Sequence, residues 1–105
     1  MARVVAVVSD LMLASRVRAA LEAAGHEVEQ DAAAPGEADG VDLIVADLDI
    51  ADPEALAALE VPTIGFYPHT DTEAKRRAEA AGLELVVPRS RMSRELPELA
   101  ARVLG

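Results

Sequence analysis

The stretch Arg3-Val-Val-Ala-Val-Val-Ser9 is a continuous run of apolar, mostly β-branched residues. A run without polar alternation predicts a strand that is buried on both faces, as in the middle of a parallel sheet. After this strand the apolar residues recur at helical spacing, at Leu13, Val17 and Leu21. Gly25 follows where such a helix would end. A buried strand that leads directly into an amphipathic helix indicates an α/β fold.

The same alternation continues to the end of the chain. We predict four further strands, at residues 26–30, 41–47, 61–66 and 83–87. Asp52-Pro53-Glu54 combines an N-cap residue, a first-turn proline and an acid, and therefore predicts the start of a short helix. Thr70-Asp-Thr-Glu73 has the form of a capping box and predicts a helix that ends at Gly82. We expect a loop at Arg89–Ser93, followed by a last helix with Pro97 in its first turn.

One crossover lacks the pattern of a helix. Pro35 and Gly36 interrupt residues 31–40, so the second crossover helix should be shortened or absent. Because parallel crossovers are right-handed, five strands of this kind predict a doubly wound parallel sheet. The usual strand order of that sheet is 2-1-3-4-5, which is the flavodoxin-like architecture. We expect one domain over residues 1–105.

Composition excludes several classes of function. The formal net charge of −9 disfavours nucleic acid and anionic membrane surfaces as partners. The absence of cysteine excludes disulfides, thiolate metal sites and a cysteine nucleophile. No apolar run approaches the length of a membrane span, and no signal peptide pattern opens the chain, so we expect a cytoplasmic protein.

Acidic residues follow two of the predicted strands. Asp10 comes at the end of the first strand, and Asp47 and Asp49 come at the end of the third. In a doubly wound sheet the functional crevice lies outside the carboxyl ends of the strands, where the strand order reverses. We therefore expect these three carboxylates to lie close together.

On these residues the sequence resembles a response-regulator receiver domain, CheY-like, over essentially its whole length. The matching segments are Val-Val-Ser-Asp10, Val-Asp-Leu-Ile-Val-Ala-Asp47-Leu-Asp and Val-Pro-Thr-Ile-Gly-Phe. The resemblance implies that Asp47 is the phosphoacceptor position. It also implies that Asp10, Asp47 and a main-chain carbonyl near Asp49 would hold Mg²⁺, the only cofactor we expect.

The sequence departs from the receiver pattern at three marker positions. Ser9 replaces one of the two acids that end the first strand, Tyr67 replaces the Thr or Ser of the fourth, and Pro88 replaces the lysine of the fifth. Arg89 and Arg91 are the candidates to supply the missing positive charge. The resemblance is therefore to an atypical, stand-alone receiver, or pseudo-receiver.

The first functional hypothesis is a bacterial receiver-like signalling module that acts through protein–protein contacts, with weak or no phosphorylation. Its partner face would run from the fourth strand to the last helix, with Tyr67 near the surface. The face would form a basic patch that suits an acidic partner or a second copy of the chain, and it would carry Tyr67, His69, Lys75, Arg76, Arg77, Arg89 and Arg91. His69 could alternatively act as a base, a ligand or a pH-sensitive contact.

Two other hypotheses remain open. In the second, Asp47 is a working two-component phosphoacceptor that takes phosphate from a histidine kinase with Mg²⁺, so that self-phosphorylation is the only catalysis. In the third, the chain is a ligand-binding or enzymatic flavodoxin-like domain. Against the third, no Gly-rich phosphate loop follows the first strand, and the chain has only one Tyr and one Phe to stack on a flavin.

Overall fold

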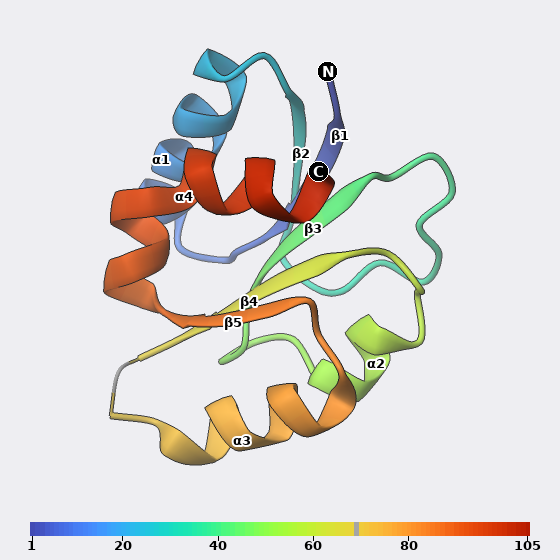
Figure 1. Ribbon diagram of the computed structural model, residues 1–105, viewed down its shortest axis with the longest axis vertical. Coiled ribbons are helices and arrows are strands. Elements are labelled where there is room, and N and C mark those ends of the chain that lie inside the picture. The colour runs from blue at the N-terminus through green and yellow to red at the C-terminus, as the bar shows by residue number, and fades with distance from the viewer. Residues whose placement is uncertain (69) are drawn as a thin grey trace.

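The protein forms a five-stranded parallel sheet with helices on both faces, as the computed structural model of residues 1–68 and 70–105 shows (Figure 1). The strands are β1 (Arg3–Val7), β2 (Glu27–Asp31), β3 (Leu43–Asp47), β4 (Thr63–Tyr67) and β5 (Leu85–Pro88). The helices are α1 (Leu11–Ala23), α2 (Pro53–Ala57), α3 (Thr72–Ala81) and α4 (Arg89–Leu104). The strand order is β2-β1-β3-β4-β5, which confirms the predicted fold class.

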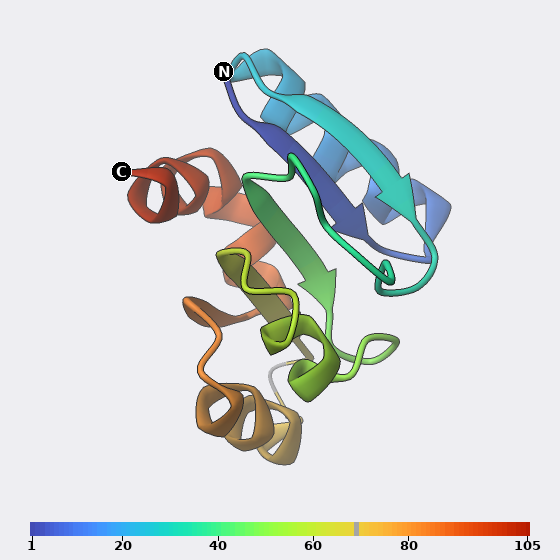
Figure 2. The ribbon, with the colours of Figure 1, turned by 90° about the vertical axis from the view of Figure 1, so that its right-hand side faces the viewer.

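The helices divide between the two faces of the sheet. Helices α1 and α4 cover one face, and α2 and α3 cover the other, as the quarter-turned view shows (Figure 2). The side chains of β1 alternate between the two faces of the sheet: Val4 packs on the side of α1 and α4, and Val5 packs on the side of α2. This double burial explains why the first strand reads as an unbroken apolar run.

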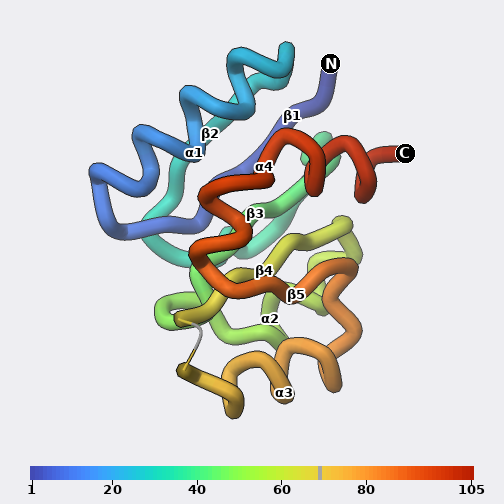
Figure 3. Tube along the Cα trace, turned by 60° about the vertical axis from the view of Figure 1, so that its left-hand side comes forward, coloured from blue at the N-terminus to red at the C-terminus, as the bar shows by residue number. Residues whose placement is uncertain are grey.

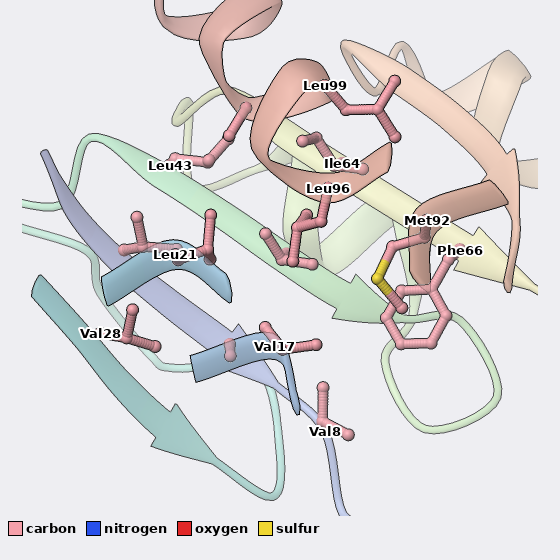
Figure 4. Close-up of a cluster of buried hydrophobic side chains, with 14 of the residues drawn as sticks. Val8, Val17, Leu21, Val28, Leu43, Ile64, Phe66, Met92, Leu96 and Leu99 are labelled. Atoms are coloured by element: carbon pink, nitrogen blue, oxygen red, sulfur yellow. The ribbon is translucent and has the colours of Figure 1, made fainter. Parts of the chain in front are cut away.

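The larger core lies under α1 and α4 (Figure 4). Val17 and Leu21 of α1 face the sheet, as their helical spacing predicts. Leu96 and Leu99 of α4 are also buried there. The aromatic content is low, so this core consists almost entirely of Val, Leu, Ile and Ala side chains, with Phe66 as its largest member.

Residues 32–42, between β2 and β3, contain no helix, and this confirms the predicted loss of the second crossover helix. The predicted start of α2 is also confirmed, because the Asp52 side chain accepts a hydrogen bond from the backbone N–H of Ala55. No helix in the described residues has the length and apolarity needed to cross a membrane.

The start of α3 differs from the prediction by one residue. Asp71, and not Thr70, is the N-cap, and its Oδ1 accepts a hydrogen bond from the N–H of Ala74 at 3.0 Å. A carboxylate oxygen is a stronger acceptor than a hydroxyl. Asp71 directly precedes the first helical residue, so its side chain can reach the free N–H of Ala74 in the first turn. The helix ends at Gly82, as predicted, with φ of +86°.

The predicted loop at Arg89–Ser93 is wrong, because α4 begins directly at Arg89. The physical reason is Met92, which is fully buried and points toward Phe66 in the core (Figure 4). A helical turn lets this segment bury one side chain while its neighbours stay exposed. The helix is kinked at Glu95, two residues before Pro97, whose ring cannot continue the backbone hydrogen-bond pattern.

Candidate functional site

The carboxyl ends of the strands lie along one edge of the sheet (Figure 3). Asp10 follows β1 as the N-cap of α1, and Asp47 is the last residue of β3. Tyr67 and Pro88 end β4 and β5 and are paired in register. The parallel arrangement thus brings together the positions that the sequence analysis singled out.

Asp47 is a buried carboxylate, with 8% of its surface exposed. Its Oδ1 accepts a hydrogen bond from the backbone N–H of Asp49 at 2.9 Å. Burial raises the pKa of Asp47, and the negative charges of Asp49 and Asp10 act in the same direction. The Asp49 N–H and the Arg89 guanidinium oppose this effect without cancelling it. Ionising Asp47 therefore costs free energy in the folded protein.

Asp10 is an exposed carboxylate that caps α1. Its Oδ1 accepts hydrogen bonds from the N–H groups of Met12 at 2.9 Å and Leu13 at 3.1 Å. The bond from Leu13 is the main cause that lowers the pKa of Asp10, and Arg89 adds to it. The two neighbouring carboxylates are therefore shifted in opposite directions, with Asp10 favoured in its charged form.

Arg89 supplies the positive charge at this edge. Its Nη2 lies 3.5 Å from Oδ2 of Asp10, and its charge also lowers the pKa of Asp47. Arg91 points elsewhere, since its Nε lies 3.6 Å from Oε1 of Glu95 on the same helix. Of the two arginines that the sequence offered, Arg89 is the one that faces the site.

The arrangement does not fit Mg²⁺ well. Mg²⁺ needs closely spaced oxygen ligands in octahedral geometry. The Oδ1 of Asp10 is taken by backbone N–H groups, and its Oδ2 faces Arg89. The residues that the structure describes contain no group of three or more His, Cys, Asp or Glu side chains arranged to hold a metal ion. Asp10 and Asp49 are close enough to Asp47 to raise its pKa, and among the described ion pairs the cation at these carboxylates is Arg89, which pairs with Asp10.

Tyr67 was expected near the surface, but the structure shows that it is buried. Only 6% of its surface is exposed, at the end of β4, which lies between β3 and β5 in the sheet. Its own neighbour Pro68 lines an open cavity of about 400 Å³ with Arg89, Ser90 and Ser93. His69 lies outside the described residues.

The expected basic face is of mixed charge. Its arginines lie beside carboxylates: Arg76 pairs with Glu73, Arg77 with Asp52 and Glu54, and Arg91 with Glu95. These contacts cancel most of the local positive charge, although none of the described ion pairs involves Lys75. The predicted basic patch is therefore a face of mixed charge, because the prediction counted the arginines without their acidic neighbours.

Two exposed apolar residues lie beside the site and were not predicted from the sequence. Leu11 and Met12 follow Asp10, and 76% and 72% of their surfaces are exposed. The signal was present in the sequence, because both residues lie off the apolar stripe of α1 that Leu13 and Val17 begin. They give the rim of this acidic edge an apolar component.

No protein-family model matches the chain, and a sequence search among curated proteins finds no match. The sheet order and the edge described above define a doubly wound α/β protein with flavodoxin-like architecture.

Within that class, the chain has the fold of response-regulator receiver domains. It is similar to a receiver domain protein of Clostridium thermocellum, with 12% identity over 99% of this chain and 94% of that chain, at a TM-score of 0.82. The receiver domain of HemR from Leptospira biflexa shares 19% identity over 100% and 95% of the two chains, at a TM-score of 0.80. The chemotaxis response regulator CheY4 of Vibrio cholerae shares 21% identity over 98% of each chain, at a TM-score of 0.76.

Proposed function

We propose that this chain is a cytoplasmic, receiver-like signalling module, one domain over residues 1–105, that acts through protein–protein contacts. Phosphorylation of Asp47 is weak or absent in this proposal. The receiver fold of the similar structures supports the signalling role. The altered residues around Asp47 support the loss of phosphoryl chemistry.

One observation carries the proposal. Asp47 keeps the place of a phosphoacceptor at the end of β3, but Pro88 occupies the strand-end position that would hold a lysine. Arg89, the residue that replaces this positive charge, is directed to Asp10 at 3.5 Å. A phosphoryl group carries its charge on several oxygens, so transfer depends on cations positioned around it. At this site the cation is held by a neighbouring carboxylate.

Two further departures support the same conclusion. Ser9 is neutral, so the acid pair that would bind a divalent cation is reduced to Asp10 alone. Tyr67 is buried, and a large buried ring cannot swing inward over a modified Asp47 as a small hydroxyl side chain could. Both differences remove parts of the machinery that the resemblance implies.

In this proposal the partner binds the face that runs from β4 to α4. This face carries charges of both signs and includes Arg91, Glu95 and Lys75. Alternating charges favour a partner of complementary, mixed charge, and a second copy of the chain meets that requirement. A histidine kinase is the partner that the alternative function would require.

The alternative function is a working phosphoacceptor that uses Mg²⁺. The specific observation in its favour is that Asp47 and Asp10 remain at the carboxyl ends of adjacent strands β3 and β1. In that case the ion pair between Arg89 and Asp10 would open to admit the cation. Because both side chains of the pair are about half exposed, such opening would cost little.

An NMR titration of the backbone amides with Mg²⁺ and then beryllofluoride separates the two functions. The proposal predicts no saturable shift of the Met12 and Asp49 amides, which report on the two carboxylates through their hydrogen bonds. The control is Asp47→Asn, which should give the same spectra with and without beryllofluoride. Saturable shifts in the native protein that disappear in Asp47→Asn would overturn the proposal and establish the phosphoacceptor.

A further inference from the structure

We propose that Arg89 is a built-in cation of this site, which neutralises Asp10 and keeps divalent metal ions out. The inference deepens the proposed function and rests on it, because it explains how a receiver-like site can remain without its metal. It also assigns a role to the first residue of α4, a segment that the sequence pattern alone placed in a loop.

The position of Arg89 follows from the backbone. Pro88 ends β5 in register with Tyr67, so the next residue necessarily emerges at the edge where β1 and β3 also end. Because α4 starts at Arg89, its backbone lies at the beginning of a helix and not on an irregular loop. Its Nη2 lies 3.5 Å from Oδ2 of Asp10.

The contact is selective among the arginines of α4. Arg91 lies 3.6 Å and Arg94 3.2 Å from the carboxylate of Glu95, so both are paired within their own helix. Arg89 is the arginine of this helix whose described ion pair reaches another element of the fold. Its positive charge also opposes the rise in the pKa of Asp47, although burial of the carboxyl group outweighs it and the pKa stays raised.

Two physical effects disfavour a divalent cation at this position. The first is repulsion, because a metal bound to Asp10 and Asp47 would lie within a few Å of the guanidinium charge. The second is competition for ligands, because the two oxygens of Asp10 already contact the α1 backbone and Arg89. Removing the guanidinium relieves the repulsion and exposes Oδ2 of Asp10.

The inference is tested by the affinity of the protein for Mn²⁺, measured from the paramagnetic broadening of the Met12 and Asp49 amide signals. We expect Arg89→Gln to bind Mn²⁺ about tenfold more tightly than the native protein, the size expected for removing one positive charge near a doubly charged ion in water. Arg89→Lys should bind like the native protein, because it keeps the charge. Arg91→Gln is the matched control and should change the affinity by less than about twofold, because it removes an equal charge that faces Glu95.

If the native protein binds Mn²⁺ too weakly to measure, the same comparison is made in a Ser9→Asp variant. Ser9→Asp restores an acid beside Asp10, and Arg89→Gln should increase Mn²⁺ affinity in this background as well. Circular dichroism of each variant checks that α4 remains folded. The inference is overturned if Arg89→Gln and Arg91→Gln give equal affinities in both backgrounds. A beryllofluoride response in the native protein would instead overturn the proposed function, so the two failures are distinguishable.

Discussion

Tyr67 and Pro88 lie opposite each other, as the last residues of the parallel strands β4 and β5. In the receiver pattern that the sequence resembles, these two positions carry the Thr or Ser and the lysine. The two departures are therefore direct neighbours in the folded protein, and together they replace a small hydroxyl side chain and an ammonium group by a buried phenol ring and a proline. The edge beside Asp47 is less polar as a result.

The first prediction restores a positive charge at this edge. Pro88→Lys should lower the pKa of Asp47, because an ammonium group beside the buried carboxylate favours its charged form. The pKa is measured from the carboxyl carbon signal in a pH titration. Ala80→Lys on the exposed face of α3 adds the same charge elsewhere and should leave the pKa of Asp47 nearly unchanged. Equal effects of the two substitutions would show that the end of β5 does not face Asp47.

The second prediction concerns the cost of charge at Asp47. Burial raises the pKa of Asp47 in the folded state above its value in the unfolded chain. Ionisation therefore destabilises the fold at neutral pH, and this penalty disappears as the pH falls below about 3.9, the ordinary value for Asp. Asp47→Asn should therefore raise the free energy of unfolding at neutral pH and have little effect near pH 4.

Urea denaturation at the two pH values measures the difference. Asp39→Asn removes the same charge from an exposed loop and should change the free energy of unfolding by less than about 0.5 kcal/mol. If Asp47→Asn is destabilising at neutral pH, the carboxylate is held by contacts that outweigh its desolvation.

The third prediction tests the helical start of α4. Met92 is fully buried in the core under α1 and α4, so Met92→Ala should lower the free energy of unfolding by about 2–5 kcal/mol. Met12→Ala is the matched control, because 72% of Met12 is exposed, and it should change the value by no more than about 0.5 kcal/mol. If both variants lose only a little free energy of unfolding, the result would favour the predicted loop at Arg89–Ser93 over the helical start of α4.

The fourth prediction distinguishes the two candidate caps of α3. Asp71→Ala should lower the free energy of unfolding by about 1 kcal/mol, because it removes the acceptor of the Ala74 N–H. Thr70→Ala should have a smaller effect, since the side chain precedes the cap. Thermal denaturation followed by circular dichroism measures both, and the reverse ranking would favour the capping box read from the sequence.

The fifth prediction contrasts two exposed glycines. Gly82 ends α3 with φ of +86°, a conformation that a side chain disfavours, so Gly82→Ala should cost about 1–2 kcal/mol. Gly36 has no positive φ and no atom within 4 Å of an added Cβ. Gly36→Ala should therefore be neutral or stabilise the protein by up to about 1 kcal/mol, because it restricts the unfolded chain. Chemical denaturation of both variants tests the contrast.

The fold was predictable to a large extent because its signals are local. The unbroken apolar run from Arg3 to Ser9 requires burial on both faces, and Pro35 and Gly36 are incompatible with a regular crossover helix. The start of α4 was not predictable in the same way. Burial of Met92 depends on the space that β4 and α1 leave above the sheet, and no local pattern in Arg89–Ser93 reports that space.

The candidate site divides in the same manner. The sequence placed Asp10, Asp47, Tyr67 and Pro88 at strand ends, and parallel pairing was enough to bring those ends to one edge. It left open whether Arg89 or Arg91 faces the acids, because both are arginines near the end of β5. It also assigned basic character to residues such as Arg77, whose carboxylate partners lie on another helix.

The strands, the helices and the position of Asp47 at a strand end could be predicted from the sequence alone, because hydrophobic periodicity and helix caps act over a few neighbouring residues; the strand order followed from the usual arrangement of five parallel strands. The contact of Arg89 with Asp10, the burial of Tyr67 and the pairing of arginines on the β4-to-α4 face became visible only in the folded protein. These features depend on the distance and direction between side chains from different elements. Such geometry exists only after the helices have packed onto the sheet.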